Sequence, residues 1–189
     1  AHAAVEGSKK LTEEHRINPD RIQKIIVETF DQAAALGTAL PRTTEEAQFN
    51  LAWPVAAMLV DGEIGPKQTS TARLKDPVVR SLASRVEVQV TQELNELRRL
   101  FELGDPKGRF ASLVTLVLEN GESYGSGLVE GGFAYPPRSW SSAEMEEKFH
   151  WLIDPVLDEK TANRLVEMVW RLEEEQDLRE LIALSTTDR

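Results

Sequence analysis

Two stretches of the chain carry the residue pattern of β-strands. Residues 85–90 alternate strictly between valine and polar side chains, which is typical of a strand with one buried face. Residues 22–30 are rich in β-branched side chains and predict a second strand. Asn120-Gly121 separates two apolar runs, and this dipeptide is the strongest local signal for a hairpin, here with a type I′ turn. The pattern therefore predicts two separate strands followed by a hairpin.

Helices are predicted from apolar stripes and from capping residues. Residues 1–14 predict a short helix of moderate amphipathicity. Thr43 and Glu46 form a capping box, and the helix that it opens carries apolar residues at helical spacing as far as Asp61-Gly62. Pro54 lies inside that helix, and we expect a kink there because its ring displaces the carbonyl one turn back.

The order of the elements favours an α+β fold. Asp76-Pro77 and Ser141 begin further helices, and two more helices fill the C-terminus. The chain thus runs helix, strand, helices, strand, hairpin, helices, with the helices gathered toward its ends. We expect one α+β domain over residues 1–189, in which an antiparallel sheet with a β-hairpin is packed by helices from both ends of the chain.

Charge and composition exclude several classes of function. The chain has 189 residues, with 32 Asp and Glu against 22 Lys and Arg and a formal net charge of -10. Such a chain is repelled by phosphate backbones and anionic lipids, so neither nucleic acid nor a membrane is an expected partner. It lacks cysteine, which excludes disulfides, a thiolate nucleophile and Cys-based zinc sites. No apolar run approaches the length of a membrane span, and we expect a cytoplasmic protein.

Candidate chemistry is sparse, and histidine supplies most of it. The sequence contains no phosphate loop, no nucleophile elbow and no paired zinc-binding histidines, so we expect neither a cofactor nor a metal ion. His15 and His150 lie in patterns typical of solvated or structural histidines. His2 differs because it lies on the first turn of a small-residue helix, where close approach to another surface is possible.

Six segments of the chain carry a recognisable pattern when they are taken in order. The first reads His-Ala-Ala-Val-Glu, the second INPDRIQKIIVET, and the third contains a Thr motif and ends in Asp-Gly. The segments are residues 2–6, 17–29, 41–62, 76–90, 118–121 and 137–149. Together they resemble the C-terminal domain of the MmgE/PrpD family, which includes 2-methylcitrate dehydratase, cis-aconitate decarboxylase and iminodisuccinate epimerase. The six segments span nearly the whole chain, so the resemblance concerns the entire domain.

The resemblance implies a two-domain enzyme, of which this chain is the smaller part. Family members pack an α+β lid over a large helical N-terminal domain and act on small di- or tricarboxylates between the two, without metal or organic cofactor. Their reactions are dehydration, decarboxylation or epimerisation, which need proton transfer beside a carboxylate. The helical domain is absent from these 189 residues, so we expect it as a partner, on the same chain or a separate one. By itself the lid is expected to be inactive.

The resemblance also assigns roles to individual residues. His2 falls on the family's boundary histidine and is the expected catalytic residue, as a substrate contact or proton-transfer group. Arg42 and Thr43 are expected substrate-binding residues, with Arg42 as a carboxylate clamp. Trp53 stands where the family has tyrosine, and is the third expected substrate contact. Because an indole has no titratable hydroxyl, any acid role of that tyrosine is lost.

Two alternatives remain beside the enzyme lid. One is a stand-alone binding module that keeps the lid fold without its chemistry, and Trp53 favours it. The other is a split enzyme with a separately encoded helical subunit. A lid is expected to expose an apolar patch near residues 1–5 and Trp53, whereas an independent module would be polar there. An uncovered lid could also form a homo-oligomer.

Overall fold

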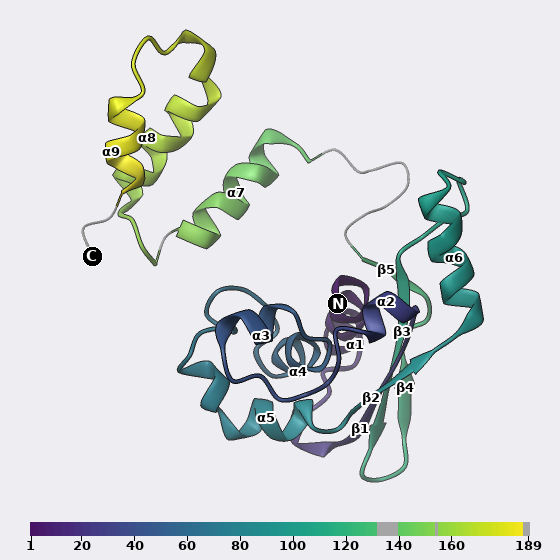
Figure 1. Cartoon of the computed structure of the whole chain (residues 1–189). Helices are drawn as coiled ribbons and strands as arrows, with labels where there is room; N and C mark the ends of the chain where they lie inside the picture. Colours follow the sequence, from purple (N-terminus) through teal and green to yellow (C-terminus); the bar gives the residue numbers. More distant parts are fainter. Residues whose placement is uncertain (132–139, 154, 187–189) are drawn as a thin grey trace. The chain divides into compact units, whose positions relative to one another are not determined.

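The computed structural model describes residues 1–131, 140–153 and 155–186. Contacts divide the chain into two compact units, residues 1–138 and 139–189 (Figure 1). We refer to them as the first and the second unit and describe each by itself. The single domain expected over residues 1–189 stays a prediction.

A five-stranded sheet organises the first unit. Its strands are β1 (Ile22–Thr29), β2 (Val86–Val90), β3 (Ala111–Leu118), β4 (Ser123–Gly125) and β5 (Val129–Glu130). The order is β2-β1-β3-β4, with β5 paired to β3. Every pair is antiparallel except β1 with β2, which are joined by a helical crossover, as parallel neighbours require. The predicted α+β class is confirmed, with one parallel pair in a mostly antiparallel sheet.

One face of the sheet carries the core. On β1 and β3, the buried side chains alternate with half-buried ones, as the period of two along a strand dictates. Ile25 and Val27 of β1 and Val114 and Leu116 of β3 are fully buried. These four residues face the helices that fill the rest of the core.

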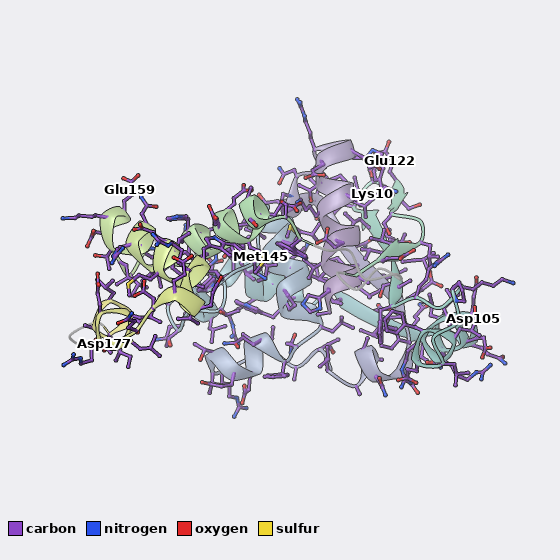
Figure 2. The ribbon with its side chains drawn as sticks, turned by 90° about the horizontal axis from the view of Figure 1, so that it is seen from above. Lys10, Asp105, Glu122, Met145, Glu159 and Asp177 are labelled. Atoms are coloured by element: carbon purple, nitrogen blue, oxygen red, sulfur yellow. The ribbon has the colours of Figure 1, made fainter. Side chains whose placement is uncertain are left out.

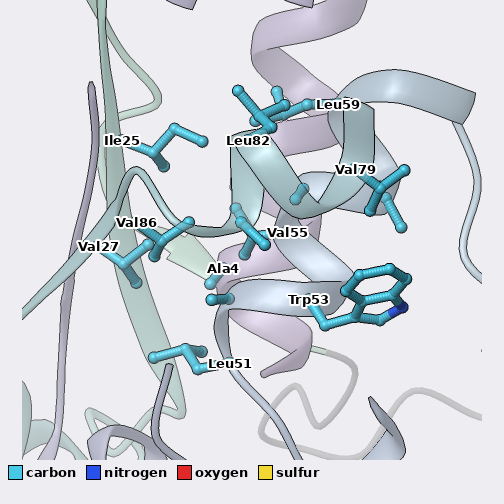
Figure 3. Close-up of a cluster of buried hydrophobic side chains, with 14 of the residues drawn as sticks. Ala4, Ile25, Val27, Leu51, Trp53, Val55, Leu59, Val79, Leu82 and Val86 are labelled. Atoms are coloured by element: carbon cyan, nitrogen blue, oxygen red, sulfur yellow. The ribbon is translucent and has the colours of Figure 1, made fainter. Parts of the chain in front are cut away.

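The first unit has helices on this face and elsewhere around the sheet. They are α1 (His2–His15), α2 (Asp31–Ala34), α3 (Thr44–Gln48), α4 (Ala52–Asp61), α5 (Pro77–Ala83) and α6 (Gln92–Glu102), with short 3₁₀ turns at Pro19–Arg21 and Arg73–Lys75. Figure 1 shows α1, α4 and α5 on one side of the strands. Figure 3 shows Val55 of α4 and Leu82 of α5 meeting Val86 in the shared cluster.

Helix α1 lies unusually close to β3 because its inner face is made of small residues. Ala4, Gly7 and Ser8 are buried on that face. A Cβ on Gly7 would lie 2.9 Å from Val114 Cγ2 and 3.2 Å from Ser126 Oγ. The Ser8 hydroxyl donates to the Ala4 carbonyl oxygen at 2.8 Å, so this buried polar group is satisfied within the helix. This close packing holds α1 in a fixed position against β3.

Two local predictions are wrong. The expected kinked helix is two helices, since α3 ends at Gln48 and α4 begins at Ala52. Pro54 therefore lies in the first turn of α4, where its missing N–H would have no helical partner anyway. The hairpin turn is not type I′, because that turn needs positive φ at both central residues. Among the described residues only Arg16 and glycines, including Gly121, have positive φ.

The hairpin instead uses a three-residue loop. Gly121 N donates to Leu118 O at 2.9 Å, and Leu118 N donates to Glu122 O at 2.8 Å. With Gly121 at a φ of 85°, this is the turn that ends in a glycine bulge. The glycine is required, although not at the turn position that the dipeptide suggested.

The second unit is a small helical assembly. It contains α7 (Ser142–Ile153), α8 (Glu159–Trp170), a 3₁₀ turn at Leu172–Glu174 and α9 (Arg179–Ser185). The Ser141 capping box is confirmed, with Glu144 Oε2 accepting from Ser141 N at 2.9 Å and Ser141 Oγ accepting from Glu144 N at 3.3 Å.

Little of the second unit is buried. Among its described residues the buried apolar side chains are Ala162, Leu165 and Met168. A hollow of about 570 Å³ between α7, α8 and α9 is lined almost entirely by apolar residues, including Phe149 and Leu165. Met145 on its wall and the acidic Glu159 and Asp177 elsewhere on the unit are exposed (Figure 2).

Candidate functional site

The first turn of α1 is positioned by a glycine. Gly131 follows β5, and its N–H donates to the Phe110 carbonyl oxygen at 2.9 Å. A Cβ on Gly131 would lie 2.5 Å from Ala3 N and 3.0 Å from His2 Cβ. Only a residue without a side chain allows the backbone to pass so close to the helix start. The sheet thereby holds the turn that carries His2.

His2 is exposed and lines two hollows of the first unit. One hollow has a volume of about 390 Å³, and the other a volume of about 650 Å³. Both lie within the range typical of ligand sites. A histidine at such a place suits proton transfer because its ordinary pKa is near neutrality.

The smaller of the two, which we name the phenylalanine hollow, has an aromatic wall formed by Phe30, Phe101 and Phe110. The ring centroid of Phe110 lies 5.5 Å from that of Phe30 and 4.5 Å from that of Phe101. Ala33 and Leu51 complete its apolar lining. These residues come from α2, α6, the N-cap of α4 and the chain at the ends of β1 and β3, so the hollow forms only in the folded unit.

Ser112 is the polar group set into this apolar wall. Its side chain is buried, and its Oγ lies 2.9 Å from the buried Thr29 Oγ1. The two hydroxyls form a hydrogen bond with each other across β3 and β1. Because each has a partner, the wall presents no unsatisfied buried hydroxyl here.

The larger cavity, which we name the threonine hollow, has a more polar lining. Thr44 and Gln48 of α3 contribute to it, and Thr69 contributes from the loop after α4. Glu6, one turn along α1 from His2, is its charged side chain. Neither hollow is lined by Lys or Arg among the residues that the structure describes. The described lining of the two hollows thus offers a histidine and neutral donors, but no Lys or Arg side chain, for a carboxylate.

Arg42 and Thr43 lie at the start of α3, outside the lining of both hollows. Thr43 is the N-cap, and its Oγ1 accepts from Glu46 N at 3.2 Å. The Glu46 carboxylate accepts from Arg42 N at 2.7 Å, one residue before the cap position expected of a capping box. The Arg42 side chain is exposed. A substrate-binding role for either residue stays a prediction.

The same helix start stabilises negative charge. The pKa of the Glu45 carboxyl is lowered by a backbone hydrogen bond at Glu45 and then by the Thr43 and Thr44 hydroxyls. Free N–H groups and the helix dipole favour a carboxylate at this position. Thr44, rather than Thr43, extends this region into the threonine hollow.

Trp53 belongs to the core. Its side chain is 0% exposed, and its Nε1 donates to the Gln68 carbonyl oxygen at 2.9 Å. In Figure 3 its indole lies on the side of the cluster away from Val27 and Ile25. The apolar surface patch expected at Trp53 is therefore wrong, because the aromatic ring is covered. An apolar surface does occur near residues 1–5, in the phenylalanine hollow.

Gln68, whose carbonyl oxygen accepts from Trp53, also belongs to a partly buried polar network. Gln68 Nε2 donates to Asp61 and to Glu63 at 3.2 Å each. Arg73 pairs with Asp61 and, at 2.6 Å, with Asp76. The network ties the loop after α4 to the indole, so a loop rich in polar residues has a fixed conformation.

The sequence pattern did not point to Gly131 or to the three phenylalanines. Phe30 and Phe110 are 80 positions apart in the sequence, and no local motif joins them. The register of the antiparallel pair β1 and β3 brings them together, since Glu28 near the end of β1 pairs with Leu113 near the start of β3. That register depends on the hairpin and on the order of the strands, which the residues alone left open.

Neither a membrane span nor a metal cluster is found in the part of the chain that the structure describes. None of its helices is both long and apolar enough to cross a bilayer. No group of three or more His, Asp or Glu side chains there could hold a metal ion. The candidate site consists of the two hollows that His2 lines.

A family model matches most of the chain. The family model described as the MmgE/PrpD C-terminal domain matches residues 1–174. This confirms the resemblance carried by the six segments, and the match takes in the first unit and most of the second. A comparison with curated proteins finds no match.

Proposed function

Because the chain belongs to the MmgE/PrpD family through its C-terminal domain, we propose that its first unit is the lid of an active site. The enzyme is a lyase or isomerase that acts on small di- or tricarboxylates. It moves a proton at a carbon beside a carboxylate, in dehydration, decarboxylation or epimerisation. The chain reaches this activity only when a helical N-terminal domain completes the site.

The observation that carries the proposal is the place of His2. It is exposed at the start of a rigidly packed helix and lines both hollows. A general base or acid must reach the proton that it transfers. Helix α1 and Gly131 fix the backbone of His2, so the lid supplies a positioned titratable group at its rim.

The same lining explains why a partner domain is needed. Carboxylate substrates are held by cationic or strong hydrogen-bonding groups, and neither hollow has a Lys or Arg among its described lining residues. The clamps for the carboxylates then come from the helical domain, with Arg42 as the clamp that the family position suggests in this chain. A lid alone binds substrate weakly and does not turn it over.

An exposed apolar surface on the second unit is a second argument for a partner domain. Its apolar hollow lies among exposed Met145, Val169 and Trp170. An exposed apolar surface of this kind marks an interaction site. We assign it to the helical domain, which would pack its own apolar helix faces into the hollow.

The test uses the chain together with its helical partner. The tagged chain is recovered from its native lysate, and mass spectrometry identifies a longer form or a bound helical MmgE/PrpD domain. The assembled enzyme is then incubated in D₂O with 2-methylcitrate, cis-aconitate or iminodisuccinate, and proton exchange and turnover are followed by NMR. Removal of a general acid–base lowers the rate by about 100-fold or more, so this loss is expected for His2→Gln.

His15→Gln is the matched control, at the opposite end of the same helix. Its ring packs against Tyr124 at a centroid distance of 4.6 Å, away from both hollows. We expect unchanged turnover for this variant. If the chain is recovered alone and no carboxylate exchanges a proton, the enzyme reading fails, and the stand-alone binding module takes its place.

A further inference from the structure

We propose that the outer edge of β2 pairs with the same edge of a second copy of this chain, so that two sheets join into one. The contact is antiparallel and has two-fold symmetry, as a closed contact between identical surfaces requires. It goes beyond the proposed lid function and stands independently of it, because no residue of β2 is among the described lining of the two hollows at His2.

Strand β2 lies at one end of the sheet, and β1 is the only strand beside it among the residues that the structure describes. The Arg85 carbonyl oxygen accepts a hydrogen bond from β1 at 3.0 Å, and Thr91 N donates one to the last residue of β1 at 3.1 Å. Because backbone groups alternate in direction along a strand, those of Val86, Val88 and Val90 point to the outer edge. Such a row of donors and acceptors is a template for another strand.

This edge carries none of the features that usually protect a sheet edge from pairing. Residues 86–90 read Val-Glu-Val-Gln-Val, without proline or lysine, and they pair with β1 without a shift in register, so no bulge turns the edge away. Val90 is 50% exposed. The opposite edge differs, since β4 has three residues and ends in Gly125, and a very short edge strand is a poor template.

A register centred on Val88 satisfies both the backbone and the charges. Val88 then lies opposite Val88 of the copy, Val86 lies opposite Val90, and each pair exchanges backbone hydrogen bonds. Glu87 lies opposite Gln89, so that no like charges meet. A register centred on Glu87 would set two carboxylates opposite each other, which is unfavourable. A register centred on Gln89 would leave Val86 outside the paired strands.

The sequence of β2 favours a second copy over other occupants of this edge. It is self-complementary, since the two-fold axis brings valine to valine and glutamate to glutamine. The partner domain proposed above is helical, and the backbone groups within a helix already bond to one another. The net charge of -10 opposes association of two copies. At the contact itself this repulsion is reduced, because Lys24 Nζ lies 2.7 Å from the Glu87 carboxylate.

Sedimentation velocity of the full 189-residue chain tests the pairing. Two strands of five residues each bury little surface, so we expect a weak dimer that forms between about 1 and 100 µM and doubles the mass. Val88→Pro removes an outward N–H and leaves the bonds to β1 intact, since proline is tolerated where its nitrogen faces away from the neighbouring strand. We expect this variant to stay monomeric.

Ser123→Pro is the matched control on the opposite edge. Glu122 and Ser126 form backbone hydrogen bonds with β3 at 2.8 Å each, so the nitrogen of Ser123, which lies between them, also points away from its neighbour. The variant adds the same proline to the other edge and should dimerise as the parent chain does. Circular dichroism checks that both proline variants keep the fold.

A single introduced cysteine tests the register, because the chain has no cysteine of its own. In the register centred on Val88, the two Val88 Cα atoms lie about 5.5 Å apart, within the range of a disulfide. The two Val90 Cα atoms lie about 13 Å apart or more, since Val90 is opposite Val86 and a strand rises about 3.3 Å per residue. Under copper phenanthroline, Val88→Cys should crosslink about 10-fold faster than Val90→Cys, although Val90 is the more exposed side chain.

The results separate the edge contact from other modes of association. A dimer that Val88→Pro abolishes and Ser123→Pro retains, with the faster crosslink at position 88, upholds it. A chain that stays monomeric up to about 1 mM overturns it, as does a dimer that Val88→Pro retains or that Ser123→Pro also abolishes. If a proline variant fails to fold, the crosslinking rates decide, and equal rates at positions 88 and 90 overturn the contact. Turnover enters none of these measurements, so the lid function stands or falls by its own assay.

Discussion

Gly131 and Ala3 approach so closely that a Cβ on Gly131 would lie 2.5 Å from the Ala3 amide nitrogen. The contact involves backbone on both sides, so a larger residue cannot be accommodated by turning a side chain. The strand end after β5 therefore sets the position of the helix start that carries His2. The geometry of the candidate site depends on this glycine as much as on the histidine.

We predict that Gly131→Ala displaces the first turn of α1. The clash with Ala3 N should cost about 1–3 kcal/mol of unfolding free energy, as overpacking does. Turnover by the assembled enzyme should fall because His2 moves with the turn. Urea unfolding and steady-state kinetics measure the two effects.

Gly125→Ala is the control for that prediction. A Cβ there would meet only Thr115 Oγ1, at 3.9 Å, so its stability should change by less than about 0.5 kcal/mol. Full activity in Gly131→Ala would show that the close approach does not position His2.

We predict that Trp53 contributes to the stability of the fold and not to substrate binding. Trp53→Phe leaves the buried Gln68 carbonyl without the indole donor and opens space in the core. We expect a loss of about 3 kcal/mol of unfolding free energy and an unchanged KM, since Trp53 lines neither hollow. Trp151→Phe, on exposed surface, should cost less than about 0.5 kcal/mol. A raised KM at unchanged stability would support the substrate contact that the family position suggested.

The sequence predicted the elements well and the site only in part. Asp76 before Pro77, Thr43 with Glu46, and Ser141 with Glu144 are local signals, and each marks a helix start in the structure. His2 was chosen because a histidine on a small-residue helix start is unusual and because the family segments frame it, and its catalytic role stays a prediction. Local signals work where the chemistry involves residues a few positions apart.

Long-range packing explains what the sequence did not predict. The burial of Trp53 depends on Gln68, in a loop whose polar composition suggests exposure. The phenylalanine hollow needs Phe30 and Phe110 to meet through the pairing of β1 with β3. Such contacts follow from strand order and register, which no single segment encodes.

Thr43 is predicted to serve as a helix cap. Thr43→Ala removes the acceptor for Glu46 N and should cost about 1 kcal/mol of unfolding free energy. Thr43→Ser keeps the hydroxyl and should retain most of that stability. Both variants should leave KM unchanged, and thermal melts with kinetics measure this. A KM that rises in Thr43→Ala and recovers in Thr43→Ser, at equal stability, would instead place substrate at this hydroxyl.

Acid should weaken the second unit through Asp158. Its pKa is lowered by hydrogen bonds from the Thr161 backbone N–H and then the Thr161 hydroxyl, which form the N-cap of α8. A folded-state pKa below the ordinary value of 3.8 means that the stabilisation is complete above that value. It is lost as the pH falls through the lowered pKa.

Asp158→Asn keeps a capping side chain but cannot ionise. Its helix content should therefore depend less on pH than that of the unchanged chain, between about pH 5 and pH 2. Glu159→Gln removes the same charge on the same turn and leaves the cap in place, so its acid profile should follow the parent. Far-UV circular dichroism measures both profiles. Identical profiles for all three proteins would contradict a role for the Asp158 cap.

The last prediction concerns the apolar surface of the second unit. Val169 and Ile182 are 54% and 59% exposed, and burying them against a helical domain would release water from both surfaces. Val169→Lys with Ile182→Lys should abolish co-purification of that domain, while the unfolding free energy of the chain changes by less than about 1 kcal/mol. Binding of the dye ANS, which reports exposed apolar surface, should fall as well. Val156→Lys adds a lysine at a similarly exposed site that lies on neither α8 nor α9 and should keep the partner. If the double variant retains the partner as fully as Val156→Lys does, the helical domain binds elsewhere, and the apolar surface of α8 and α9 has another role.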